Sequence, residues 1–171
     1  MISRPKSSDC TDYYFTYIDQ VPEGDIISTL ENQLDETTQF LQGINEEKAM
    51  HRYAAGKWSM KEVIGHVIDT ERVFAFRALC FARNDKSELP AMEQDDFVKF
   101  ANFDTQAWQD LREELKHVRL ANVFLFKSFD EEILSRKGMA SGFEFTVRAF
   151  PWIIAGHERH HLRVLKECYL S

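Results

Sequence analysis

Four segments of this chain carry apolar side chains at the three- and four-residue intervals of an α-helix. A helix with one apolar stripe has to bury it against another element, so four such segments favour helices packed on one another. No segment shows the sustained two-residue alternation of a strand, and the 7 Gly and 4 Pro are too few for a turn-rich β architecture. The helical segments cover about residues 25–41, 58–83, 106–125 and 146–169.

The second segment carries its own start signal. Ser59 precedes Glu62 by three residues, the arrangement of a capping box, in which each side chain bonds a backbone N–H group of the first turn. One stripe of this helix mixes apolar and polar side chains. Its members are Val63, His66, Val67, Thr70, Val73, Phe74, Arg77 and Phe81.

The start of the last helix has two interpretations. The preceding connection contains Gly138, Ser141 and Gly142 and is predicted as a loop. Pro151 then either kinks the helix or lies in its true first turn, because a proline in a helix interior removes one backbone hydrogen bond.

The connection between the second and third helices, about residues 84–103, is long enough to run the whole length of a bundle. These two helices can therefore be parallel, which gives an up-down-down-up order and leaves the second and fourth helices antiparallel. We predict an all-α fold, a four-helix bundle with long connections, in a single domain over residues 1–171. About residues 1–20 are expected to be an N-terminal extension. The 44% of apolar residues, including 14 Phe, can fill such a core.

Charge and hydropathy argue against several classes of function. The net charge of −7 argues against nucleic acid, because such binding needs lysine and arginine to neutralise phosphates. The longest apolar runs are a few residues, far short of the roughly 20 that span a membrane, and residues 1–19 lack the apolar core of a signal peptide. Three cysteines without a CxxC pattern fit a reducing compartment, so we expect a cytoplasmic protein.

Three histidines mark a candidate metal site. His157 and His161 are four residues apart, which places both imidazoles on one face of the fourth helix. His66 lies about 10 Å from the start of the second helix, and the histidine pair lies about 16 Å from the end of the antiparallel fourth helix, so all three fall near one end of the bundle. Three protein ligands leave positions open for water and substrate, which is the pattern of a catalytic site.

The alternative is that these are ordinary core or surface histidines. Among the six histidines of the chain, a pair four residues apart arises by chance often enough to be weak support for a ligand set. The residues by themselves therefore leave both interpretations open. His51, His117 and His160 are expected to be structural or solvated, since they lie in a loop or off the apolar stripes.

Three acidic residues adjoin the candidate ligands. Asp69 and Glu71 follow the histidine of the second helix, and Glu158 lies inside the pair of the fourth, so any of them can orient an imidazole or act as a catalytic base. A solvated or salt-bridged acid is the alternative for each. Residues 157–161 literally match the pattern HExxH, but a zincin needs a further downstream ligand, and only ten residues remain.

Two motifs resemble those of a known family. The runs KWSMKEVIGHVIDTER (residues 57–72) and AGHERHH (residues 155–161) are similar to the helix-2 and helix-4 signatures of the DinB-like (YfiT-like) metal-binding four-helix bundles. The family is distinct from the DNA polymerase that shares the name. The resemblance implies an up-down-down-up bundle in which His66, His157 and His161 hold one divalent ion, often zinc or nickel. It also implies a homodimer.

The resemblance leaves three alternative functions open. Some relatives transfer bacillithiol, mycothiol or glutathione, so we expect first a metal-dependent transfer of a low-molecular-weight thiol to a small electrophilic substrate, with Arg72 or Arg148 binding an acidic group of the thiol. Others are described as metal-dependent hydrolases, for which the neighbouring acids supply the base. The third alternative is a non-catalytic metal-binding stress-response module, whose site is closed by a fourth protein ligand such as His117.

Overall fold

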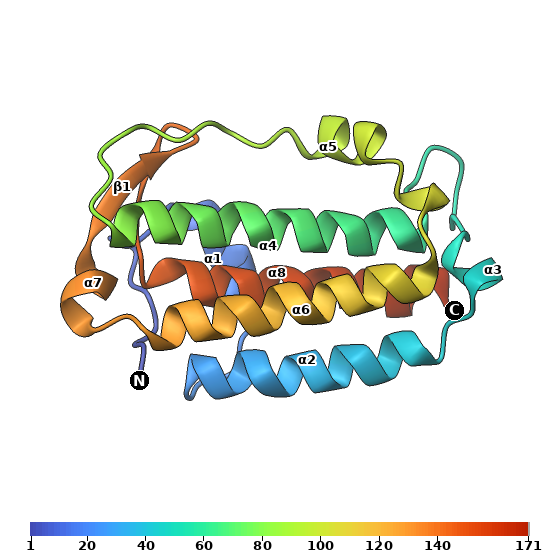
Figure 1. Cartoon of the computed structure of the whole chain (residues 1–171), viewed down its shortest axis with the longest axis horizontal. Coiled ribbons are helices and arrows are strands. Elements are labelled where there is room, and N and C mark those ends of the chain that lie inside the picture. Colours follow the sequence, from blue (N-terminus) through green and yellow to red (C-terminus); the bar gives the residue numbers. More distant parts are fainter. Residues whose placement is uncertain (171) are drawn as a thin grey trace.

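Four long helices lie side by side in the computed structural model, which describes residues 1–170 (Figure 1). They are α2 (Ile26–Gln42), α4 (Met60–Ala82), α6 (Trp108–Lys127) and α8 (Ala149–Val164). Helices α2 and α8 run in one direction and α4 and α6 run in the other, so the order along the chain is up, down, down, up (Figure 1). The predicted all-α four-helix bundle is confirmed.

The core forms where the apolar stripes of these helices meet. Each helix contributes side chains that are almost fully shielded from solvent, and burying one leucine or isoleucine in this way stabilises the fold by about 1.5–3 kcal/mol. Four of these residues, one from each helix, are exposed by 1% or less: Leu30, Ile64, Leu111 and Ile153.

The connection between α4 and α6 runs along the bundle from one end to the other, as its length predicted (Figure 1). It contains α5 (Gln94–Ala101) and the 3-10 turn η1 (Phe103–Thr105), which the sequence did not predict. Helix α5 is eight residues long and buries only Val98, so its apolar pattern covers too few turns to identify a helix. Asn102 ends it with a φ of 54°, in the left-handed region that asparagine tolerates.

The starts of α4 and α6 are held by side chains. The predicted capping box of α4 is confirmed, with the Ser59 hydroxyl accepting from the Glu62 N–H and the Glu62 carboxylate accepting from the Ser59 N–H. Helix α6 begins at Trp108, slightly later than predicted, because η1 ends at Thr105 and the backbone of Gln106 and Ala107 is extended. The Trp108 N–H donates to the carboxylate of Glu46, at 2.8 Å, in the short helix α3 (Glu46–Ala49).

A β-hairpin replaces the predicted loop before the last helix, so that prediction is wrong. The short helix α7 (Glu131–Ser135) is followed by β1 (Lys137–Ala140) and β2 (Phe143–Thr146), which pair antiparallel. The two turn residues, Ser141 and Gly142, both have positive φ, as a type I′ hairpin turn requires. Strands of four residues are too short to show a clear alternation in the sequence.

Helix α8 resolves the ambiguity at Pro151. The helix begins at Ala149, later than the predicted Thr146, because Thr146 belongs to β2. Pro151 therefore lies in the first turn, where its missing N–H removes no helical hydrogen bond. The helical path continues through a wider π turn over Leu165–Tyr169, as far as predicted.

The N-terminal segment adds α1 (Asp12–Ile18), which packs against α8. The contact is close because Gly156 has no side chain. A Cβ atom at this position would stand 2.2 Å from the backbone carbonyl oxygen of Tyr17. Since a backbone atom cannot rotate away, the approach of the two helices depends on glycine here.

Gly156→Ala is therefore expected to lower the free energy of unfolding by about 1–3 kcal/mol, because the added methyl group displaces α1. Helix propensity alone predicts the opposite sign, a gain of about 1 kcal/mol. Gly43→Ala is the matched control, since its Cβ would make only an ordinary 3.5 Å contact. Urea denaturation of both variants measures the difference, and equal stability of the two would contradict the close contact.

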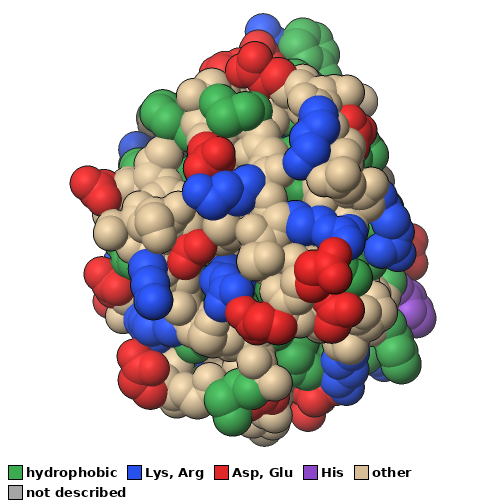
Figure 2. All heavy atoms as spheres, turned by 90° about the vertical axis from the view of Figure 1, so that its left-hand side faces the viewer, with side chains coloured by type: hydrophobic (Ala, Val, Ile, Leu, Met, Phe, Trp, Pro, Cys, Tyr) green, Lys and Arg blue, Asp and Glu red, His purple; other side chains and the backbone are tan. Residues whose placement is uncertain are grey.

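The surface mixes charges of both signs. At the end of the bundle formed by α7 and the hairpin, acidic and basic side chains alternate without a continuous patch of either sign (Figure 2). Three ion pairs at this end contribute to the pattern, Arg136–Glu132, Lys137–Glu144 and Arg148–Glu131. Within residues 1–170, no helix combines the length and apolarity that a membrane crossing needs.

Candidate metal centre

The side chains of His66, His157 and His161 converge between α4 and α8. The Nε2 atom of His157 lies 3.2 Å from that of His66 and 3.1 Å from that of His161. One ring nitrogen from each residue lies within 4.8 Å of the other two. The antiparallel packing of α4 and α8 thus brings together the three residues that the sequence singled out.

These distances suit a bound metal ion. Two nitrogens that each lie about 2.0–2.1 Å from a tetrahedral ion stand about 3.3 Å apart, close to both measured separations. A neutral imidazole carries one N–H group, so Nε2 of His157 cannot donate hydrogen bonds to both neighbours at once. The three histidines can therefore hold a metal ion, and three protein ligands leave further positions open.

Burial keeps these imidazoles neutral. Loss of hydration lowers the pKa of His66 to about 4 and, with the neighbouring charges of His66 and His160, lowers the pKa of His161 to about 3. Burial, followed by the charges of the neighbouring histidines, also lowers the pKa of His157 well below its ordinary value. Because a metal binds the unprotonated nitrogen, the fold presents the ligands in the form that coordination needs.

The lowered pKa values predict an acid-sensitive metal-free protein. Between pH 6.5 and about 4, the unfolded chain binds a proton at His66 while the folded chain does not, so the free energy of unfolding falls as the pH falls through this window. Within this window His66 alone lowers the free energy of unfolding by up to about 1.4 kcal/mol for each pH unit of acidification. Above pH 6.5 it no longer affects the slope. Urea denaturation across this range measures the slope.

Two variants isolate the contribution of the buried histidine. His66→Gln is expected to reduce the pH dependence by the share that His66 contributes, because one of the three histidines whose pKa differs between the folded and unfolded states is gone, while His157 and His161 remain. His117→Gln should behave like the wild type, since the His117 side chain is 74% exposed. Equal slopes in all three proteins would show that the buried histidine does not control the acid response.

Neighbouring side chains fix the orientation of His66. Its Nδ1 atom lies 3.4 Å from the Thr70 hydroxyl, one turn further along α4, and the Trp58 ring packs against it with 5.0 Å between ring centroids. When the Nδ1–H group donates to this hydroxyl, the lone pair of Nε2 points toward the other histidines. Gly65 lets Phe103 pack beside the ligand, since a Cβ there would stand 2.4 Å from the Phe103 ring.

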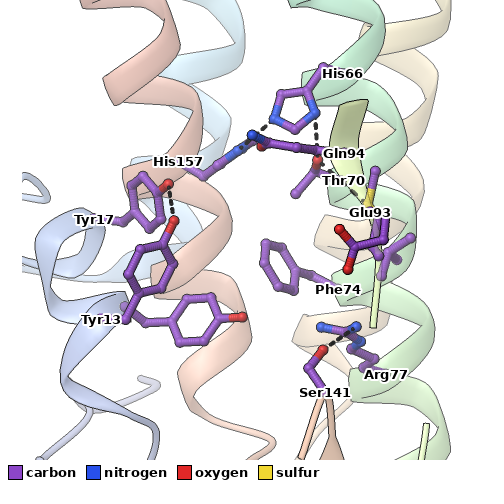
Figure 3. A pocket seen from close by; sticks show the side chains of 13 residues that line it. Tyr13, Tyr17, His66, Thr70, Phe74, Arg77, Glu93, Gln94, Ser141 and His157 are labelled. Atoms are coloured by element: carbon purple, nitrogen blue, oxygen red, sulfur yellow. Dashed lines mark hydrogen bonds between the residues drawn. The ribbon is translucent and has the colours of Figure 1, made fainter. Parts of the chain in front are cut away.

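A cavity of about 260 Å³ opens beside the histidines (Figure 3). His66 and His157 form part of its wall, so a small molecule in the cavity can reach two of the three candidate ligands. The remaining lining comes from α1, α4, the α4–α6 connection and the hairpin turn. These residues are Tyr13, Tyr14, Tyr17, Thr70, Val73, Phe74, Arg77, Met92, Glu93, Gln94 and Ser141.

A buried ion-pair network joins α4, α6 and α8. Arg119 donates from Nε and Nη2 to the two carboxylate oxygens of Glu71, at 2.9 and 2.8 Å, and from Nη2 to Glu158 at 2.6 Å. All three side chains are 1–2% exposed. Burial of Arg119 acts to lower its pKa, but the carboxylates of Glu158 and Glu71 outweigh burial and hold the pKa above its usual value.

Helix α2 completes the network. The Glu158 carboxylate also accepts hydrogen bonds from Gln33 and Thr37, both at 2.6 Å. Because Glu158 follows His157 directly on α8, and Glu71 follows His66 on α4, the network fixes the rotation of both helices that carry the histidines.

Comparison with known proteins decides the family. The sequence model of the DinB superfamily matches residues 29–165, a range that contains all three histidines. This chain belongs to the DinB superfamily. No curated protein matches the chain.

A solved structure has the same fold. It is YfiT from Bacillus subtilis, described as a probable metal-dependent hydrolase with an unusual four-helix bundle topology. The two structures superpose with a TM-score of 0.74 over 97% of this chain and 91% of YfiT, at 15% sequence identity. At this identity the likeness supports the up-down-down-up architecture, and the chemistry has to be argued from the DinB site of this chain.

The acids predicted beside the histidines lie away from the cavity of this DinB protein. Glu71 and Glu158 form the buried network with Arg119, where every carboxylate oxygen has a partner. Asp69 is half-buried and pairs with Arg72 at 3.5 Å. Burial raises the pKa of Asp69, and the charge of Arg72 counteracts this.

The other histidines do not join the cluster. The ring of His160 packs against that of Tyr17, with 5.6 Å between centroids. The exposed His117 lies near Glu113 on the outer face of α6, so it cannot close the site as a fourth ligand. His51 is exposed as well. The site therefore stays open toward the cavity on the side of His66 and His157.

Several residues that line the cavity were missed by the sequence analysis. Tyr13 and Tyr17 belong to the segment predicted as an extension, although their spacing of four residues is helical. Glu93 comes from the long connection, where no periodic pattern marks it. Arg77 was placed on the correct stripe of α4, eleven residues after His66, but was given no role. The shared stripe was the available signal.

Proposed function

We propose that this DinB protein is a metal-dependent enzyme that transfers a low-molecular-weight thiol to an electrophilic substrate. The observation that carries the proposal is the convergence of three neutral imidazoles, two of which, His66 and His157, lie in the wall of an open cavity. Zinc and nickel are the expected ions, because both accept imidazole nitrogen readily. The proposal is supported by the superfamily and by the metal dependence named for YfiT.

The chain's own residues have distinct parts in this scheme. The three histidines hold the ion, and Thr70 orients His66. A divalent ion held there lowers the pKa of a thiol that binds it, so that the nucleophile forms at neutral pH. The rings of Tyr13, Tyr17 and Phe74 line the cavity and exclude water from an apolar electrophile.

The position of the acids favours a thiol over water as the nucleophile. Attack by water normally needs a carboxylate or similar base to take a proton, whereas a thiol can ionise with the help of the ion alone. Glu71 and Glu158 form ion pairs with Arg119, and Asp69 forms one with Arg72. Of the residues that line the cavity, Glu93 alone is acidic.

Hydrolysis of an amide or ester is the second candidate, and Glu93 is the observation that favours it. Its carboxylate lies in the wall of the cavity that also contains His66 (Figure 3). A base at this position would allow water to act as the nucleophile. The description of YfiT as a probable hydrolase points the same way.

The test compares the two reactions in the same metal-loaded protein. A panel containing glutathione, bacillithiol, mycothiol and cysteine is assayed for conjugation to a chromogenic aryl halide, and ester and amide substrates are assayed without thiol. Thiol transfer predicts metal-dependent conjugation that Glu93→Gln leaves largely intact. Metal-dependent turnover without thiol, lost in Glu93→Gln, would establish hydrolysis instead. The absence of conjugation above background with every thiol would overturn the first proposal.

A further inference from the structure

Arg77 is a buried cation in the wall of the cavity. Its side chain is 3% exposed, and within residues 1–170 no carboxylate lies within 4.0 Å of its guanidinium. Its hydrogen bonds go to neutral oxygens, from Nη2 to the Pro90 carbonyl at 2.7 Å and to the Ser141 hydroxyl at 2.9 Å. A buried charge without a counterion is costly to the fold, which makes this position unusual.

The other buried cations in the described chain show the usual arrangement. Lys61 is 2% exposed and forms an ion pair with Glu46. Arg119 is 1% exposed and binds both Glu71 and Glu158. Arg77 differs from both because, within the described residues, no carboxylate forms an ion pair with it, and because it lines an open cavity.

The position of Arg77 relative to the histidines limits the size of a ligand that bridges them. The Phe74 ring lies between the two (Figure 3). Its centroid is 6.4 Å from that of the His157 ring, and the Arg77 guanidinium carbon lies 5.8 Å from the Phe74 centroid, so His157 and the guanidinium are at most about 12 Å apart. Both groups face the same cavity.

We propose that Arg77 binds the carboxylate of the substrate thiol, while the sulfur of the same molecule reaches the ion at the histidines. This inference rests on the proposed function and adds the class of thiol to it, an acidic one. Contacts of sulfur with the ion and of carboxylate with guanidinium take up most of the 12 Å limit, which leaves room for a short chain of about two or three carbons. The cations named from the sequence, Arg72 and Arg148, already pair with Glu114 and Glu131.

The charge of the cavity favours a carboxylate over a phosphate ester. Arg77 supplies one positive charge, and Glu93 on the same wall is acidic. A monoanion neutralises the guanidinium, whereas a dianion leaves an additional negative charge beside Glu93. The Ser141 hydroxyl, 2.9 Å from Nη2, adds a neutral polar group next to the bound acid.

The test titrates cobalt(II)-loaded protein with 3-mercaptopropionate and with 3-mercaptopropan-1-ol, two thiols of equal length with and without the carboxylate. Binding is followed by the thiolate-to-cobalt charge-transfer absorption. The wild type is expected to bind the acid at least about tenfold more tightly than the alcohol. In Arg77→Met the ratio falls to about one while the affinity for the alcohol stays unchanged, and Arg77→Lys retains part of the preference.

A thiol without an acid separates a bridging role from a purely structural one. The affinity of propane-1-thiol should be independent of the substitution, because it has no carboxylate for Arg77 to bind. Equal binding of the acid and the alcohol, or a preference that persists in Arg77→Met, would overturn the proposal.

A second measurement does not depend on the metal. Metal-free wild type is titrated with hexanoate and with hexan-1-ol, and the Nε–H resonance of Arg77, assigned from its loss in Arg77→Lys, is followed by NMR. Hexanoate is expected to shift this resonance and hexanol is not. If cobalt fails to bind, the proposed function fails, and this titration still decides the role of Arg77. An unmoved resonance at saturating hexanoate would show that Arg77 binds no carboxylate.

Discussion

Arg119→Met is expected to lower the free energy of unfolding by about 3–5 kcal/mol at neutral pH. The substitution keeps much of the side-chain volume but removes the cation that binds Glu71 at 2.8 Å and Glu158 at 2.6 Å. Two carboxylates, each 2% exposed, are then left without a counterion. Urea denaturation at constant ionic strength measures the loss.

Arg72→Met is the matched control for this experiment. Arg72 also contacts two acids, Asp69 at 3.5 Å and Glu114 at 2.6 Å, but its side chain is 48% exposed. Solvent screens such pairs, so its removal should lower the free energy of unfolding by less than about 1 kcal/mol. If both substitutions destabilised the protein equally, burial of the network would not be the source of its strength.

His157→Ala is expected to abolish binding of divalent ions. His157 is central in the cluster, because its Nε2 atom lies 3.2 Å and 3.1 Å from the nitrogens of the other two histidines. In the wild type, zinc at a free concentration of about 100 times its Kd should raise the free energy of unfolding by about 2.7 kcal/mol. The variant should show no increase. Each protein is compared with itself, with and without zinc, so the loss of packing at the substituted site cancels.

His160→Ala controls for the change of a histidine on the same helix. Its ring packs against Tyr17 and contributes no nitrogen to the cluster, so zinc should stabilise this variant as it does the wild type. Loss of zinc binding in His160→Ala together with its retention in His161→Ala would mean that a different pair on α8 holds the ion.

The long helices were predictable because buried apolar residues recur along them at three- and four-residue intervals. Each carries an apolar stripe over many turns, and the capping box at Ser59 marks where α4 begins. The length of the connection that follows was sufficient to predict the parallel arrangement of α4 and α6. Once α4 and α8 are antiparallel, the positions of His66, His157 and His161 along them place all three at one level.

The short elements carried too little local signal. Helices α1 and α5 have seven and eight residues, and only Ile18 and Val98, respectively, are buried in them. Their positions are set by contacts with distant residues, such as the approach of Tyr17 to Gly156. Such contacts depend on packing that a single segment does not encode.

The roles of the acids depended on a partner that lies far away in the sequence. Glu71 and Glu158 stand next to histidines along the chain, which suggested a place in the catalytic site. In the fold they turn toward Arg119, which is 48 and 39 residues away from them. Position on a helix places a side chain on a face, but the packing of α6 decides what that face meets.

Elemental analysis of the purified protein, with the wild type beside His66→Ala, tests the central claim most directly. The claim is that His66, His157 and His161 together hold one metal ion. We expect about one zinc, nickel or similar ion per chain in the wild type and close to none in the variant. A wild type that takes up no divalent ion after incubation with zinc and nickel, or a variant that retains its full complement, would contradict the claim.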